Sequence, residues 1–498
     1  MAYQSARLAF SARHRGTRSP NCGINAARAC GLSKQVARHH AARHRSTLFA
    51  GGVVRLGYSV VPQEACQSAT LVEKYRADPF MMSSGGRPRR AALAFIFVTV
   101  LIDMLAFGMT LPVLPVLVQQ FASDSAARGA EIFGVFGTAW ALMQFIFSPV
   151  QGALSDRFGR RVIILTSCTG LGLDFVLMAL ASNLCWLFAG RIISGIAAAS
   201  VSTAGAYIAD VTPPERRAAS FGLIGVAFGI GFVLGPAIGG LLGTISPRLP
   251  FWASAFMAFA NVCWGVFVLP ESLAKDKRAA FHWKSANPFG ALKLLRSQPV
   301  LIGLAHSFFL INLAYVALPS IAVLYMHYRY KWDTGSVGLV LTGVGAFSLV
   351  VQGILVKPAV HLFKERRAIA LGLVFGAAGF VIYGLAPTGR IFWIGVPVMA
   401  LLGIATPTLQ AIMTRLVDST EQGRLQGALA SLSGLANLIG PLLFTQLFAA
   451  SIDVPAGSEG RPGAAFLLSA AIVLSATVVM WHSTKSPARL NGPGGASA

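Results

Sequence analysis

Residues 152–161 read GALSDRFGRR, a short charged stretch between two long apolar runs. The chain has 498 residues, of which 55% are hydrophobic and only 12% are charged. Uncharged runs of about 18–25 residues recur along it, and each is long enough to cross a bilayer core as a helix. Lipid offers backbone groups no hydrogen-bond partner, so such runs are expected to be helical. The sequence therefore predicts an all-α membrane protein that crosses the bilayer many times.

Twelve membrane spans are expected from these runs. Their ranges are 92–118, 131–153, 162–182, 184–209, 218–244, 250–270, 299–326, 335–361, 367–386, 390–413, 424–449 and 462–482. Lysines and arginines concentrate in every second connection between the spans. The positive-inside rule assigns such connections to the cytoplasm. We therefore expect both termini to be cytoplasmic.

Two distant stretches of the chain are similar in sequence. SFGLIGVAFGIGFVLGPAIGG (220–240) aligns with LQGALASLSGLANLIGPLLFT (425–445) at an offset of 205 residues. The arginine pair at 160–161 recurs at 366–367, an offset of 206. The repeat predicts two pseudo-symmetric six-helix bundles, an architecture of transporters whose substrate binds near mid-membrane between the bundles. Repeated packing motifs without transport are the alternative.

The chain is expected to have five parts. They are a basic N-terminal extension (1–80), a six-helix bundle (81–270), a cytoplasmic linker (271–298), a second six-helix bundle (299–485) and a disordered tail (486–498). The extension is rich in arginine and poor in acids, which suits a disordered cytosolic tail or an organelle transit peptide. A third interpretation, which we favour, is that translation starts at Met81 or Met82.

The residue types in the charged stretch suit a tight turn between antiparallel helices. Glycine lets the chain turn sharply, and Asp156 is expected to cap the next helix, where backbone N–H groups and the helix dipole favour a carboxylate. The arginines anchor the turn in the cytosol, although any basic loop would also serve as a topology signal. The residues of this expected gating loop are Gly152, Asp156, Arg157, Gly159, Arg160 and Arg161, with Asp210 as their partner.

The spacing G-x-x-x-D-R-x-G-R-R resembles, without a gap, the signature loop of the major facilitator superfamily. Two motifs narrow the resemblance to its twelve-helix drug–proton antiporters. DMLAFGMTLPVLP (103–115) resembles their first-helix motif, and GFVLGPAIGG (231–240) resembles the fifth-helix motif associated with antiporters. Glycines four residues apart permit close helix contact and proline permits a bend, which suits either rocking or static packing. The second motif consists of Gly231, Gly235, Pro236, Gly239 and Gly240.

Within the antiporters, the chain resembles the tetracycline/proton group over residues 91–485, for example in GRIISGI (190–196) and LQAIMTRLVD (409–418). The resemblance implies a major facilitator fold and proton-coupled export. That group also carries a histidine in span eight and an acid in span nine, where this chain has Ser348 and Gly376. The resemblance implies that the span-nine acid of that group handles magnesium–tetracycline. Its absence from this chain argues against tetracycline as the transported compound.

Three ionisable residues fall inside predicted spans, namely Asp103, Asp174 and Arg191. Each is costly to place in lipid, which makes it a functional candidate. If all three face a central cavity, either carboxyl group can take up and release a proton as its hydration changes. The alternatives are that Asp174 and Arg191 form a purely structural pair and that Asp103 is a hydrogen-bonded residue at a helix kink.

Polar and aromatic residues within the spans are candidates for the substrate cavity, although such polar residues also hold helices together. They are Gln144, Gln352, Asn312, Gln410, Asn437, Phe107 and Tyr207. The sequence has no metal-spaced His/Cys cluster and no phosphate-binding loop, so we expect neither an enzyme nor a bound cofactor. A proton gradient must then supply the energy.

These features favour a proton-coupled antiporter that exports an amphipathic, drug-like compound from a bacterial cell through the inner membrane. Its expected partners are the lipid bilayer, a small organic substrate and protons, without nucleic acid, and a monomer is expected to suffice. Two alternatives stay open. One is a symporter or facilitator that imports a small metabolite, and the other is a membrane sensor or scaffold that transports nothing.

Overall fold

The computed structural model describes residues 87–484, except 123–124, 199, 214–216, 275, 277, 279–289, 297–298, 419–420 and 454–459. The chain separates into two units, Met1–Ser83 and Ser84–Ala498, and every described residue belongs to the second. The predicted extension (1–80) and tail (486–498) therefore lie outside the described residues, as does much of the predicted linker.

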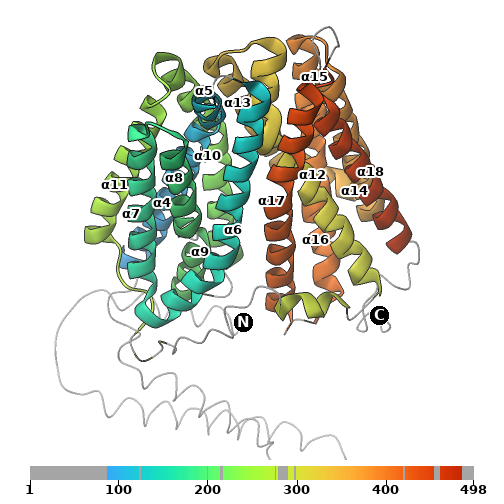
Figure 1. The fold of residues 1–498 in the computed structure, drawn as a ribbon. Coiled ribbons are helices and arrows are strands. Elements are labelled where there is room, and N and C mark those ends of the chain that lie inside the picture. The colour runs from blue at the N-terminus through green and yellow to red at the C-terminus, as the bar shows by residue number, and fades with distance from the viewer. Residues whose placement is uncertain are drawn as a thin grey trace, which may run out of the picture. The chain divides into compact units, whose positions relative to one another are not determined.

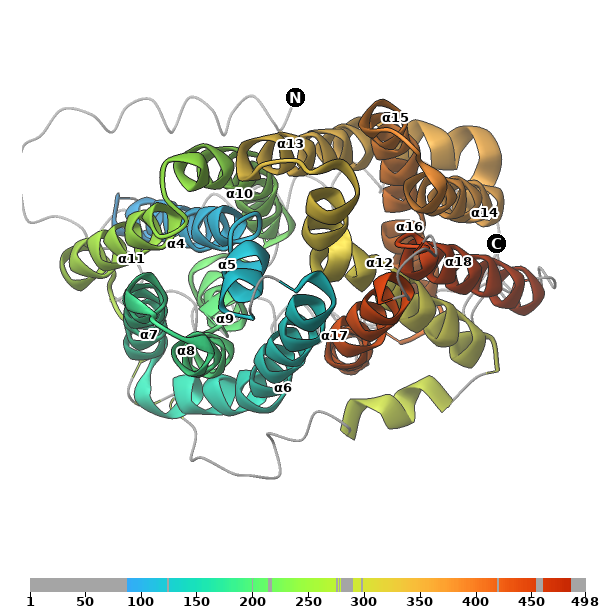
Figure 2. The same ribbon diagram turned by 45° about the horizontal axis from the view of Figure 1, so that its top comes forward.

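All regular elements of the described residues are helical. The first half contains α4 (Arg87–Thr110), α5 (Leu114–Phe121), α6 (Ala126–Phe158), α7 (Arg160–Leu180), α8 (Leu184–Ala197), α9 (Ser200–Val211), α10 (Arg217–Ile245) and α11 (Leu249–Val268). The second half contains η5 (Gly290–Arg296), α12 (Pro299–Tyr330), α13 (Thr334–Val350), η6 (Val351–Leu355), α14 (Val356–Leu385), α15 (Gly389–Ala400), η7 (Leu401–Ile404), α16 (Ala405–Arg415), α17 (Gln422–Ile452) and α18 (Ala464–Ser483). Figures 1 and 2 show the two halves as separate helix groups side by side. The predicted all-α fold is confirmed.

Among the described residues, ten helices are long and apolar enough to cross a membrane. One of them, Thr334–Leu385, contains the two predicted spans 335–361 and 367–386. The non-helical backbone of Lys364, with a φ of 60°, lies between these two spans. The shorter α8 and the following α9 together cover the predicted span 184–209. The first predicted span is interrupted between Thr110 and Leu114, where Pro112 offers no N–H to a helix. Each predicted range thus falls on helix, although several spans are broken.

Side chains fix where several helices begin. Ser125 accepts a hydrogen bond from a backbone N–H in the first turn of α6, as Asn183 does for α8 and Asp333 for α13. The hydrogen bonds from Ser336 hold the pKa of Asp333 below its ordinary value. Large apolar side chains such as Phe256 and Phe267 are exposed on the outer surface, at 76% and 88%, as a lipid-facing surface requires.

The repeated Gly-Pro stretches occupy equivalent places in the two halves. α10 packs against α4 in its own half and against α13 in the other, while α17 packs against α12 and α6 in the same way. A Cβ atom on Gly108 would lie 2.9 Å from the Gly235 Cα, so only glycines permit the α4–α10 contact. The interface between the halves is therefore built mainly on two related helix pairs, α10–α13 and α6–α17.

These two helix pairs touch at one end of the protein and separate toward the other. Near the end of contact, a Cβ on Gly240 of α10 would lie 3.0 Å from the Gly338 Cα of α13. In α6 and α17, Gly137 lies against Pro441 and Gly434 against Phe145. We call the opposite end, which holds Gly159 and Lys364, the basic end; it is the lower end in Figure 1.

Toward the basic end, the same helix faces lose their neighbours. Gly152 lies about two turns beyond Phe145 on α6, and Gly222 lies about two turns before Gly229 on α10, which still contacts Leu349. A Cβ on Gly152 or Gly222 would meet nothing within 4 Å, and the same holds for Gly353 and Gly423. The four interface helices therefore border open space at the basic end, whereas they are closed at the other end.

Candidate functional site

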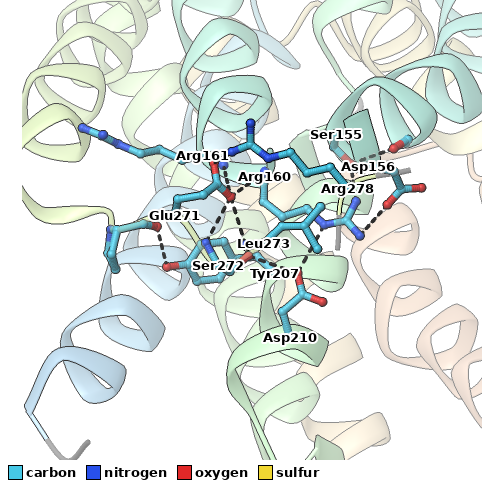
Figure 3. Close-up of polar contacts among 12 residues, drawn as sticks. Ser155, Asp156, Arg160, Arg161, Tyr207, Asp210, Glu271, Ser272, Leu273 and Arg278 are labelled. Atoms are coloured by element: carbon cyan, nitrogen blue, oxygen red, sulfur yellow. Dashed lines mark hydrogen bonds and ion pairs between the residues drawn. The ribbon is translucent and has the colours of Figure 1, made fainter. Parts of the chain in front are cut away.

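A cluster of charged side chains surrounds Arg160 at the basic end of the first half (Figure 3). The Arg160 Nη2 atom lies 2.6 Å from Asp156 Oδ1, and its Nε atom lies 3.3 Å from Asp210 Oδ2. Its Nη1 atom donates to the Ser155 hydroxyl. These residues come from α6, α7 and α9, so Arg160 ties three helix ends together. The structure thus brings Asp210 to the residues with which the sequence grouped it.

Glu271, which follows α11, caps the N-terminus of α7. Its Oε1 atom accepts hydrogen bonds from the backbone N–H groups of Arg160 at 2.9 Å and Arg161 at 3.5 Å. Gly159 at the N-cap position has no side chain to offer, and Asp156 pairs with the Arg160 guanidinium instead. The prediction that Asp156 caps this helix is therefore wrong. Glu271 lies 110 residues beyond Arg161 in sequence, so no local sequence pattern predicts that it caps α7.

The turn between α6 and α7 is shorter than the sequence suggested. α6 continues to Phe158 and α7 begins at Arg160, so Gly152 lies inside a helix and does not form the turn. Gly159 alone joins the two helices, with a φ of 106°, which side-chain-bearing residues rarely adopt. A Cβ there would also collide with the Glu271 carboxylate. Gly159 is therefore the glycine that the turn needs.

Removing the cap tests this arrangement. Glu271→Ala should destabilise the protein by about 1 kcal/mol, because two N–H groups of α7 lose their acceptor. The measurement is the apparent unfolding temperature of the purified protein in detergent. Glu271→Gln keeps an acceptor oxygen and should recover most of the loss. Glu131→Ala, at an acid that pairs with the exposed Arg128, is the control; equal unfolding temperatures for the two alanine variants would contradict the capping role.

A second charged cluster lies at the basic end of the other half. Glu365 forms an ion pair with Arg415 at the end of α16. Arg366 Nη2 donates to the Trp481 carbonyl at 3.0 Å, and its guanidinium lies 3.9 Å from that indole ring centroid. Lys364, immediately before them, has a positive φ of 60°. This cluster therefore has the same two features as the cluster around Arg160, namely a residue with positive φ and an ion pair between helix ends.

The two clusters match position by position at a single offset of 205 residues. The matches are Gly159 with Lys364, Arg160 with Glu365, Arg161 with Arg366 and Asp210 with Arg415. Arg161 even donates to a backbone carbonyl at the end of α11, as Arg366 does in α18. The 206-residue offset predicted for the arginine pair is therefore wrong, because it aligned Arg160 with Arg366. In the correct register, the ion pair has opposite polarity in the two halves.

Two residues predicted for the site have other surroundings. Arg157 is exposed, and its guanidinium lies 5.1 Å from the ring centroid of Phe158. Tyr207 is completely buried, and its hydroxyl donates to the Pro270 carbonyl at 3.0 Å. Tyr207 therefore belongs to the cluster in Figure 3, and its prediction as a substrate-cavity residue is wrong. The aromatic ring fits a helix interior as well as a cavity, so its residue type could not decide between them.

Asp174 and Arg191 lie together in the interior of the first half. The Arg191 Nη2 atom lies 3.5 Å from Asp174 Oδ2 and 3.2 Å from the Met178 sulfur. The Asp174 side chain is 0% exposed and the Arg191 side chain 9%. A Cβ on Gly190 would lie 2.7 Å from Asp174 Oδ1, so the preceding glycine makes room for the carboxylate. α7 and α8 thus enclose an ion pair, and Asp174 has no surface toward an open cavity.

Asp103 is also nearly buried, at 9% exposure, in the middle of α4. It lies within electrostatic range of the Cys168 thiol, to which Asn261 Nδ2 comes within 3.7 Å. Asn261 in turn accepts a hydrogen bond from the Thr99 hydroxyl at 3.2 Å. The Asp103 carboxyl group therefore interacts electrostatically with α7, at a cysteine that in turn lies against Asn261 of α11. The next residue, Met104, contacts Gly231 of α10.

The glycines of the predicted antiporter motif face two neighbours. Gly231, Gly235 and Gly239 lie against α4, where a Cβ on Gly239 would lie 2.5 Å from the Met109 Cα. Gly240 faces α13, and Pro236 contacts both Gly108 and Gly338. The motif thus joins α4 to the interface between the halves.

The predicted cavity residues fall into two groups. Asn312, Gln352 and Gln410 line one cavity of about 370 Å³ in the second half, together with Ser348. In the first half, Phe107 stacks on Trp140 at 6.0 Å and lies 5.9 Å from Phe232, between ring centroids. These rings form an aromatic cluster from α4, α6 and α10.

Three further positions lie outside that cavity lining. Gln144 and Asn437 are half-buried and do not belong to it. Gly376 is packed against η7, where a Cβ would lie 2.7 Å from Leu402 Cδ1. A carboxylate at Gly376 would therefore displace Leu402, which itself lines the cavity.

Comparison with known proteins agrees with this geometry. A family model described as Major Facilitator Superfamily matches residues 96–441. The chain is 39% identical to the tetracycline resistance protein, class C, of Escherichia coli, over 76% of this chain and 94% of that protein. It is 34% identical to the class D protein of Salmonella ordonez, over 70% of this chain and 88% of that protein.

Solved structures agree on the fold. The crystal structure of the human organic anion transporter MFSD10 (TETRAN) aligns with a TM-score of 0.59 at 24% identity, over 79% of this chain and 100% of that one. Together with the sequence relatives, this match confirms the resemblance that the motifs indicated.

Proposed function

The chain belongs to the Major Facilitator Superfamily and is a secondary transporter, not an enzyme, and from this premise we propose that it is a proton-coupled drug antiporter. It exports an amphipathic, drug-like organic compound and takes up protons in return. The names of its relatives, tetracycline resistance proteins, support export of such a compound. We place it as a monomer in a bacterial inner membrane, with both termini in the cytoplasm.

Alternating access is supported by the two helix pairs between the halves. They are closed around Gly240 and Gly338, and they border open space at Gly222 and Gly353. With the basic end in the cytoplasm, as its arginines favour, this conformation is open to the inside. Rocking of one half against the other would close the basic end and open the opposite one.

The observation that carries proton coupling is the environment of Asp103. A carboxyl group that is 9% exposed and next to the α4–α10 contact is placed to change its hydration when rocking of the halves moves α10 against α13. Protonation of Asp103 can thus be linked to the position of α10, which bridges the halves. The buried pair Asp174–Arg191 supports a second, more rigid charged centre.

Proton release from everted membrane vesicles tests this function. Respiration acidifies the vesicle lumen, and an exported compound added outside should release protons from the lumen, seen as recovery of acridine orange fluorescence. Asp103→Asn should abolish this recovery, while Asp276→Asn, at an exposed acid in the linker, should leave it unchanged. A symporter would carry protons into the lumen with the added compound. A wild-type chain that releases no protons for any drug in a broad panel would refute the proposal.

A further inference from the structure

The cavity of the second half has a lining without charge. Its polar side chains are Asn312, Tyr315, Ser348, Gln352, Tyr383, Thr406 and Gln410, and none of the described residues that line it is acidic or basic. A cavity of about 370 Å³ is within the size range of small-molecule sites, which runs from roughly 300 to 1,000 Å³. A ligand there would find hydrogen-bonding groups and aromatic faces, but no counter-ion.

Two irregular helix turns lie next to each other in the lining of this cavity. Gln352 lies in η6, a π-helical turn, and Gly403 lies in η7, a 3₁₀ turn. A Cβ on Gly403 would lie 3.6 Å from Gln352 Cγ, so the two turns are in close proximity. Single π-turns inside α-helices occur frequently at functional sites. Within a membrane, irregular backbone is tolerated where it lines a cavity. The backbone irregularity therefore marks the same place as the cavity.

Tyr383 provides independent support for a ligand site here. It lines the cavity, its side chain is 1% exposed, and its buried hydroxyl has no hydrogen-bond partner among the described residues. The ring is held in place by stacking on Phe392, with 4.3 Å between ring centroids. Buried hydroxyl groups are normally paired, because an unpaired one loses its bonds to water without replacement. A ligand acceptor would satisfy this donor.

The amides of the lining differ in their availability. Asn312 is already engaged, because its Nδ2 donates to the Phe308 carbonyl and its Oδ1 accepts from Ser433. The side-chain amides of Gln352 and Gln410 have no hydrogen-bond partner among the described residues, although both lie in the lining. Tyr383, Gln352 and Gln410 are therefore free to bind a ligand.

We propose that this cavity binds a neutral, hydrogen-bonding aromatic group of the exported compound, and that it does so without a divalent cation. The proposal rests on the proposed export function and specifies its substrate. An ionised group would lose its hydration here without a counter-charge. Magnesium prefers carboxylate oxygens and water, and the described lining offers no carboxylate. The Tyr383 hydroxyl donates to the ligand, and the two glutamine amides donate or accept.

Binding to the purified full-length chain in lipid nanodiscs tests the proposal without a proton gradient. The probes are chloramphenicol, which is neutral and carries an aromatic ring, an amide and hydroxyls; ethidium, a cation; and tetracycline with and without MgCl₂. Equilibrium dialysis should show chloramphenicol binding that EDTA does not alter. Tyr383→Phe should weaken it about five- to tenfold, the loss expected for one hydrogen bond.

The variants separate this site from a general effect on folding. Tyr383→Phe keeps the ring that stacks on Phe392, and Gln352→Leu should weaken binding by a similar factor. Tyr328→Phe, a half-buried tyrosine outside the lining, should bind as the wild type does. The inference is overturned if chloramphenicol does not bind, if Tyr383→Phe binds it normally, or if Mg²⁺-dependent tetracycline binding is what the variant loses. Binding without proton release in vesicles would refute antiport but not this site.

Discussion

Arg191→Met is expected to be among the most destabilising single substitutions in the described part of the chain. It removes the guanidinium but leaves the Asp174 carboxylate, which is 0% exposed, without its partner. Removal of one member of a buried ion pair costs about 3–5 kcal/mol, because the remaining charge is buried and uncompensated. The expected result is a large fall in the apparent unfolding temperature and in the amount of folded protein.

The double variant Asp174→Asn/Arg191→Met should regain most of this loss, since neither charge then remains buried. Arg128→Met is the matched control, because its pair with Glu131 is exposed and worth at most about 1 kcal/mol. If Arg191→Met unfolds at the temperature of Arg128→Met, the two buried charges are not coupled. Transport by the stable double variant would assign the pair a purely structural role, and its absence would support proton transfer through Asp174.

Gly353→Trp is expected to give a folded protein that does not transport. A Cβ on Gly353 meets nothing within 4 Å in this conformation, so a larger side chain can start there without a collision, and we expect the indole to fit. Closure of the basic end would bring α10 toward this face, and the indole would then occupy the space between the helices. The expected result is loss of proton-coupled transport with an unchanged unfolding temperature. Gly152→Trp should act in the same way on the α6–α17 pair.

A cysteine reporter checks that such a variant is trapped and not merely inactive. Gly423→Cys, on the open face of α17, should react with a maleimide at the basic end, and the reaction should persist under a proton gradient only in the trapped variant. Leu362→Trp is the control, because that side chain is already 74% exposed. Gly338→Trp should instead exclude the present conformation, since its Cβ would lie 2.9 Å from the Gly240 Cα at the closed end. Normal transport by Gly353→Trp would show that the basic end does not close.

The sequence was sufficient for the fold because apolar runs and a long internal repeat are properties of many residues together. It also indicated that Arg160 and Asp210 lie in one cluster, and that Asn312, Gln352 and Gln410 share a cavity. The sequence did not predict the role of a residue where that role depends on one long-range contact. Glu271 has no local signature as the cap of α7, and Tyr207 has the residue type of a cavity but the position of a buried helix end.

Backbone irregularities were the other limit. Gly152 and Gly159 look equivalent in the sequence, and only the φ of 106° identifies Gly159 as the turn. The π-turn at Gln352 replaces one hydrogen-bonding pattern by another over five residues and leaves no compositional trace. Likewise, the 206-residue offset followed the visible repetition of two arginines. The positive φ of Gly159 and Lys364, and not the similarity of the arginine pairs, sets the alignment of the two halves at an offset of 205 residues.

The reversed polarity of the two ion pairs limits how the halves could have diverged from a common unit. Passing from Arg160–Asp210 to Glu365–Arg415 requires two charge reversals, and the first leaves like charges side by side. The Glu365 and Arg415 side chains are 32% and 58% exposed, and those of Asp210 and Arg160 are 25% and 12% exposed, so solvent screens such an intermediate better than it would in a fully buried pair. The positions that match Asp174 and Arg191 in the second half are Gly379 and Val396, both uncharged. A buried pair has no inexpensive intermediate, which accounts for its presence in one half alone.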